Sequence, residues 1–200
     1  MKSMRIAIIL ILVIAFLGCE TGRTVTRIGV DETVDLSGRW NDTDSRLVAE
    51  EMVSDALKRP WLLDFVAGAG EKPVVIVGTV RNKSSEHIEV LAFIYDIERE
   101  LINSGQVRFV ASPGQREEIR RELESQQSWA SEETVKRIAA ETGADFMMQG
   151  IITTQVDAIE GKKVVLYQVD LELINMQTTE KVWIGQKKIK KLIEQSSTEW

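Results

Sequence analysis

Cysteine and histidine each occur once in the 200 residues, as Cys19 and His87. A single cysteine excludes an intramolecular disulfide, and so few thiols and imidazoles argue against the usual zinc, copper and haem ligand clusters. Three prolines and 13 glycines argue against a long disordered or collagen-like region, and no internal repeat is present. A hydrophobic fraction of 44% is ordinary for a globular protein, so we expect one sizeable domain.

Basic residues are fewer than acidic ones, and the net charge is -6. Lys2 and Arg5 are the only charged residues before Cys19, so removing the segment that precedes Cys19 would change the net charge from -6 to -8. A surface of this sign disfavours nonspecific binding to nucleic acid. We therefore expect no nucleic acid partner.

The first residues are typical of a signal peptide. Two positive charges precede an unbroken apolar run, Ile6 to Leu17, which as a helix would be about 18 Å long and too short to cross a bilayer core of about 30 Å. With Gly18 just before it, Cys19 resembles the lipobox cysteine of bacterial lipoproteins, which carries a diacylglycerol and fatty acid (palmitate) and becomes the first mature residue. An ordinary signal peptide is the alternative. In bacterial lipoproteins, an aspartate directly after the lipidated cysteine is associated with retention in the inner membrane. The residue at this position here is Glu20, so we expect the protein in the outer membrane.

The middle of the chain predicts alternating strands and helices. Hydrophobic spacing and capping residues predict a helix that begins near Asp42 and stops before Pro60, and another over about 88–103. Strands are expected at 73–82 and 106–112, and a short edge strand within 30–36. Two further helices are expected to begin at the capping residues Ser112 and Ser131.

After Gly143 the hydrophobic period changes to two. Val165, Tyr167 and Leu171 share one face of a predicted strand, and polar residues occupy the other. Gly161 and the segment 175–180 are expected to be the turns of an antiparallel three-strand meander. The sequence thus predicts an α/β fold: a mixed sheet ending in this meander and packed by about four helices on one side.

Motifs that could carry chemistry are weak. Asn41 to Ser45 resembles the start of a calcium loop but lacks its glycine and glutamate, so helix capping is favoured. His87 has no nucleophile motif beside it, and Gly68 to Gly70 follows no strand. A lysine cluster near the C-terminus is expected to be a solvated end of the chain, with contact to an anionic partner as the alternative: Lys187, Lys188, Lys190, Lys191. We expect no catalytic residue, metal, cofactor or small-molecule substrate.

Five tryptophans accompany only two tyrosines. Tryptophan is enriched at binding hot spots, yet each of these could equally pack at the edge of a core. The candidates for partner contact are Trp40, Trp61, Trp129 and Trp183.

Several blocks of the sequence, in order and with their spacing, resemble the penicillin-binding protein activator LpoB family from about Val34 to Gly185. These blocks are "DLSGRWNDTDSRLVAEEM", "VGTVRNKSSEHI", "INSGQVRFV" and "AAETGADFMMQG". The resemblance implies a fold like the N-terminal domain of TolB. Together with the N-terminal pattern, it divides the chain into a predicted signal peptide at 1–18, a lipid anchor and tether at 19–35, an LpoB-like domain at 36–190 and a tail at 191–200.

The resemblance further implies a non-enzymatic regulator. Anchored by lipid in the outer membrane and facing the periplasm, it would bind and activate a bifunctional class A penicillin-binding protein, and so regulate peptidoglycan synthesis of the cell wall. Compared with the long, proline-rich tether of the best-known members, the 16 residues from Glu20 to Asp35 reach only about 56 Å. A TolB-like or CsgG-like structural or secretion-accessory lipoprotein of the envelope is the alternative, and an unrecognised hydrolase is a third.

Overall fold

The computed structural model of the protein describes residues 25–30, 32–110 and 143–194. The chain divides into two compact units, Met1–Glu32 and Thr33–Trp200. The described residues of the first unit form no helix or strand, and the Glu32 N–H donates to the Gly29 carbonyl at 3.1 Å. Outside the described residues lie the predicted signal peptide 1–18, Cys19, Trp129 and the helices expected from Ser112 and Ser131.

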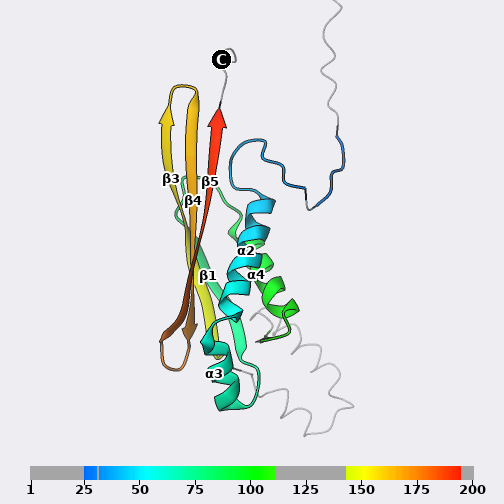
Figure 1. Cartoon of the computed structure of the whole chain (residues 1–200), viewed down its shortest axis with the longest axis vertical. Helices are drawn as coiled ribbons and strands as arrows, with labels where there is room; N and C mark the ends of the chain where they lie inside the picture. Colours follow the sequence, from blue (N-terminus) through cyan, green and yellow to red (C-terminus); the bar gives the residue numbers. More distant parts are fainter. Residues whose placement is uncertain (1–24, 31, 111–142, 195–200) are drawn as a thin grey trace, which may run out of the picture. The chain divides into compact units, whose positions relative to one another are not determined.

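The second unit is an α/β domain. Its described part contains three α-helices and a five-stranded sheet, in the chain order α2 Asp42–Leu57, α3 Pro60–Ala69, β1 Val74–Asn82, α4 Val90–Asn103, β2 Arg108–Phe109, β3 Phe146–Ile159, β4 Lys162–Asn175 and β5 Lys181–Glu194 (Figure 1).

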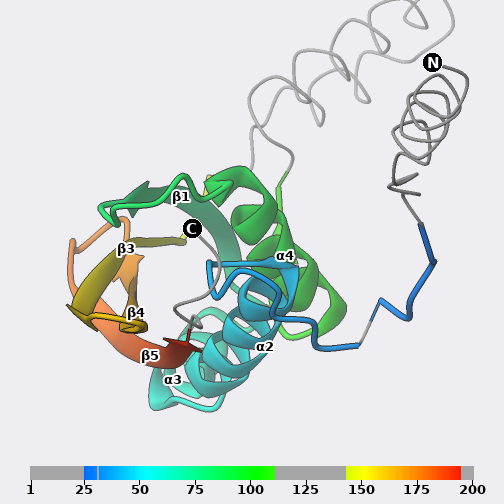
Figure 2. The same cartoon turned by 90° about the horizontal axis from the view of Figure 1, so that it is seen from above.

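The sheet is mixed, as expected from the sequence. Its strand order is β2-β1-β3-β4-β5; β1 pairs in parallel with β2 and β3, and β3, β4 and β5 form the predicted antiparallel meander. The strands curve around one side of the domain, and α2 and α4 occupy the open side (Figure 2). There α2 lies against β5 and α4 against β1, so the core fills the space between helices and sheet.

Local interactions explain where α2 begins. The Asn41 side chain accepts from the Asp44 N–H, and the Asp44 carboxylate accepts from the Asn41 N–H, both at 3.0 Å. This reciprocal cap satisfies two donors at a helix start. The cap residue is therefore Asn41, and α2 begins at Asp42, where the sequence predicts its start.

Alternation along β4 builds the sheet side of the core. The side chains predicted to face inward are buried: Val165 and Tyr167 are fully buried, and Leu171 is 1% exposed. From the helix side, α4 contributes Phe93, Ile97 and Leu101, all at most 1% exposed. Glycine is required in β3, because a Cβ on Gly150 would lie 2.4 Å from the Asp170 carbonyl oxygen.

The structure differs from the sequence-based expectations in four elements. The described residues between Val30 and Leu36 form no strand. The Val30 and Leu36 side chains are 85% and 94% exposed, so the apolar residues of this segment do not pack on the sheet. Pro60 does end α2 but also begins α3, because proline at the first helical position loses no hydrogen bond. β2 has only two residues, and β5 continues to Glu194.

Candidate functional site

A buried lysine joins the first residues of the domain to the end of the sheet. Lys191 on β5 is 8% exposed. Its Nζ donates to Asp35 Oδ1 and Asp44 Oδ2, both at 2.6 Å, and to the Arg39 carbonyl at 3.0 Å. We call Asp35, Arg39, Asp44 and Lys191 the junction cluster. It ties together the incoming chain, the start of α2 and the end of β5.

The expectation of a fully solvated lysine cluster was therefore wrong for Lys191. Alternation along β5 turns Lys187 and Lys191 toward α2 and leaves Lys188 and Lys190 exposed. Lys187 forms an ion pair with Glu51 of α2. Two of the four lysines thus bind α2 and the incoming chain, because the period of two places them on the covered face.

Electrostatics keep the buried lysine charged. Burial by itself would lower the pKa of Lys191, but hydrogen bonds and charge from Asp35 and Asp44 outweigh it and raise the pKa above its usual value. Asp44 also lies in the first turn of α2, where the helix dipole favours a negative charge. The positive charge of Lys191 is thus compensated by the carboxylates of Asp35 and Asp44.

A second polar contact lies beside the junction cluster. The Tyr167 hydroxyl is 2.8 Å from both carboxylate oxygens of Glu86 and donates between them, and it lies 3.3 Å from the Gly38 carbonyl. The Trp40 N–H donates to Glu86 at 3.3 Å. Burial raises the pKa of Tyr167, and the hydrogen bond to Glu86 and the charge of Glu86 raise it further. Through Glu86, this network ties Trp40 in the segment before α2 to Tyr167 on β4.

These two groups predict how stability depends on alkaline pH. Because both pKa values are raised, Lys191 and Tyr167 hold their protons more tightly in the folded than in the unfolded chain. Their contributions are complete below the unfolded-state values near pH 10 and are lost as the pH rises through the higher folded-state values. We expect denaturant unfolding to show constant stability from pH 7 to 9 and a fall above pH 10. The Tyr167→Phe variant should show a shallower fall, and an equally steep one would contradict this assignment.

The junction cluster shortens the predicted tether. Asn41 Nδ2 donates to Asp35 Oδ1 at 2.7 Å and to the Val34 carbonyl at 3.3 Å, in addition to the Lys191 contact. The chain is thus attached to the domain from about Thr33. Between Cys19 and this attachment remain the 13 residues from Glu20 to Glu32, which reach at most about 46 Å when extended.

Three of the candidate tryptophans pack at the edges of the core. Trp61 and Trp183 are 7% and 5% exposed. Trp61 Nε1 donates to the Ala56 carbonyl at 2.7 Å, and Trp183 Nε1 to Asp55 at 2.8 Å. Trp40 is half-buried, with its ring edge against Phe93. Partner contact through these residues, or through Trp129 outside the described part, stays a prediction.

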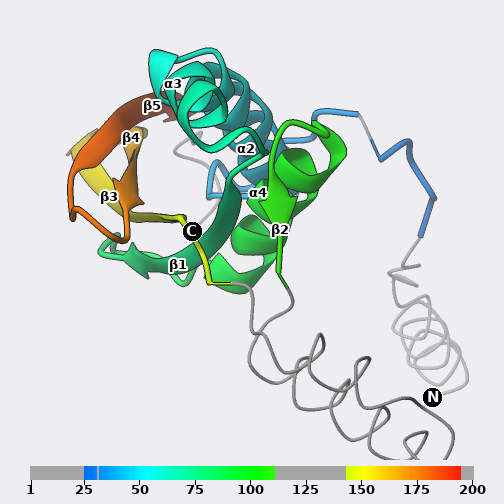
Figure 3. The same ribbon diagram turned by 90° about the horizontal axis from the view of Figure 1, so that it is seen from below.

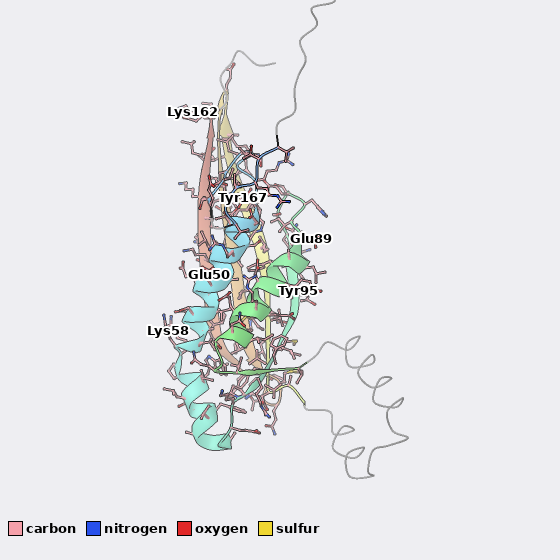
Figure 4. All side chains as sticks on the ribbon, turned by 90° about the vertical axis from the view of Figure 1, so that its right-hand side faces the viewer. Glu50, Lys58, Glu89, Tyr95, Lys162 and Tyr167 are labelled. Carbon is pink, nitrogen blue, oxygen red and sulfur yellow. The ribbon has the colours of Figure 1, made fainter. Side chains whose placement is uncertain are left out.

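Exposed apolar residues occupy the outer side of α4. Leu91, Tyr95 and Ile102 are 52%, 59% and 51% exposed, and their spacing places them opposite the buried residues of this helix. Tyr95 lies on the side of the domain, between its two ends (Figure 4). Burial also raises the pKa of Glu98, which shares this side of α4. This stripe was not recognised from the sequence, because α4 is apolar over much of its circumference.

The other motifs have structural roles in the described residues. Asn41 to Ser45 cap and begin α2, Gly70 ends α3 in the left-handed conformation with φ of 72°, and His87 is exposed. No group of acidic, histidine or cysteine side chains in the described ranges could hold a metal ion. Among these same residues, no helix is long and apolar enough to cross a membrane.

The curled mixed sheet with helices on its open side defines an α/β domain of the kind expected from the sequence, like the N-terminal domain of TolB. The sequence model of the family "Peptidoglycan-synthase activator LpoB" matches residues 44–189, which extend from the first turn of α2 into β5. The chain belongs to the LpoB family of peptidoglycan-synthase activators.

Solved structures similar to this chain include domains of that family. The C-terminal domain of LpoB from Escherichia coli is 20% identical, with a TM-score of 0.46, over 73% of this chain and 98% of that one. The Salmonella enterica domain is 19% identical, with a TM-score of 0.42 and the same coverage. Lipoprotein GNA1162 from Neisseria meningitidis is 11% identical, with a TM-score of 0.41, over 63% of this chain and 88% of that one. A comparison with curated protein sequences gave no match.

Proposed function

We propose that the protein is an outer-membrane lipoprotein that binds and activates a bifunctional class A penicillin-binding protein. The observation that carries this proposal is the family match over residues 44–189. An activator of a synthase needs a partner surface and no catalytic groups of its own. It would act by binding the active conformation of the synthase more tightly than the inactive one.

The anchor in this proposal is Cys19. A diacylglycerol on its sulfur and a fatty acid on its amino group would hold the protein in the membrane, since each buried methylene contributes about 0.8 kcal/mol. Glu20 supports the outer membrane as the location, with the domain in the periplasm. The signal-like segment before Cys19 supports export.

The reach of the anchored domain is limited. The tether contributes at most about 46 Å for its 13 residues from Glu20 to Glu32. From the attachment at Lys191, the part of β5 back to Lys181 adds roughly 33 Å along the sheet. An inner-membrane synthase must therefore extend to within roughly 80 Å of the outer membrane to be contacted.

Activation can be measured with purified components. We expect the chain from residue 20 onward to increase the glycan polymerisation rate of a class A synthase from the same organism several-fold and saturably. Polymerisation of labelled lipid II is the readout, and the heat-denatured chain is the control. Absence of both binding and a rate change with every class A synthase of that organism would refute the proposal.

A further inference from the structure

The two ends of the domain differ in what they can contact. The junction cluster lies at the first turn of α2, and α3 follows the last turn (Figure 1). The 16 residues of α2 separate the two ends by about 24 Å. We call the end that carries α3 the far end, because the tether joins the domain at the opposite one.

Aromatic contacts fix α3 on the domain. Trp61 and Phe65 pack on Phe146 of β3, with ring centroids 4.9 Å and 5.4 Å apart. Phe146 is paired with Asn175 at the end of β4, so the loop after β4 lies at the same end. These contacts hold α3 on the sheet at the far end, which is seen from below in Figure 3.

The exposed side of α3 is apolar. Leu63 and Val66 point away from the side that Trp61 and Phe65 occupy and are 74% and 38% exposed. Met176, in the loop after β4, is 46% exposed. Asp64 is the one charged residue in α3. A helix that is apolar on both sides is expected to have a second partner.

The short tether indicates what this partner is. The residues between Cys19 and the junction cluster reach only about 46 Å, so the surface that extends farthest from the anchor is the one best able to meet a protein rooted in the opposite membrane. We infer that the far end, with Leu63 and Val66 of α3 at its centre, is the surface that docks on the synthase. This inference rests on the proposed function and adds the contact surface to it.

Charge placed on α3 tests the inference. Leu63→Lys and Val66→Lys change exposed side chains, so they should leave the melting temperature unchanged. Loss of a central apolar contact typically weakens the affinity of a protein interface by about tenfold or more. We expect each variant to need at least tenfold more protein for half-maximal stimulation of lipid II polymerisation. Binding to the immobilised synthase should weaken in parallel.

Tyr95→Lys is the matched control, because Tyr95 is similarly exposed but lies on the side of the domain. It should stimulate like the unmodified chain. Unchanged stimulation by both α3 variants, or a larger loss with Tyr95→Lys, would overturn the far end as the docking surface while activation itself stands. If the unmodified chain does not stimulate, the proposed function fails instead, so the two failures are distinguishable.

Discussion

Replacing Lys191 by methionine is expected to lower the free energy of unfolding by about 3 kcal/mol, because it leaves the buried carboxylate of Asp44 without its opposite charge. Asp44 and the Arg39 carbonyl would both lose their donor from β5. Lys188→Met is the matched control. Lys188 lies on the same strand with an exposed side chain, and its replacement should change stability by less than about 0.5 kcal/mol.

Denaturant titration of the two variants measures the difference. Hydrogen exchange provides a second readout, since loss of the junction cluster should release residues 33–40 and increase their amide exchange rates. Equal stability of the Lys191→Met and Lys188→Met variants would show that the cluster does not hold the incoming chain. The attachment of the tether near Thr33 would then be wrong as well.

Substitution of Cys19 by serine is expected to have an all-or-none effect on anchoring. Without the thiol no thioether to diacylglycerol forms, so incorporation of labelled palmitate should fall to background and residues 1–18 should remain uncut. Metabolic labelling and mass measurement of the purified protein check this. Labelled protein in the Cys19→Ser variant would contradict the lipid anchor.

Glu20→Asp is the matched control for that experiment. It keeps the thiol, so labelling and cleavage should be unchanged. Because aspartate after the lipidated cysteine is associated with retention in the inner membrane, the variant should move from the outer to the inner membrane fraction. Retention in the outer membrane would leave the anchor intact but refute Glu20 as the sorting signal.

Regular patterns made much of the fold predictable. The alternation of Val165, Tyr167 and Leu171 identified β4 and its buried face, because a strand turns successive side chains to opposite sides. Spacing and capping identified α2 and α4. Pro60 was ambiguous, since proline is compatible with the end of one helix and the start of the next. The strand expected within 30–36 was wrong because alternation alone does not supply a pairing strand.

The candidate sites were less predictable than the fold. The assignment of Cys19 as the lipid anchor rests on the local sequence alone and stays a prediction. The alternation along β5 separates Lys191 from Lys188 and Lys190, but it does not reveal the partners Asp35 and Asp44, which are more than a hundred residues away in the sequence. Likewise, the aromatic contact that orients α3 joins Trp61 to Phe146.

By itself the sequence determined the membership of the LpoB family, because several blocks match in order and spacing. It also determined the meander and two helices, because each of these depends on residues close together in the chain. The tertiary structure decided which lysine is buried, where the tether meets the domain and which side of α3 remains exposed. These features depend on contacts between distant residues. Burial and charge compensation become definite only when the sheet and helices have packed together.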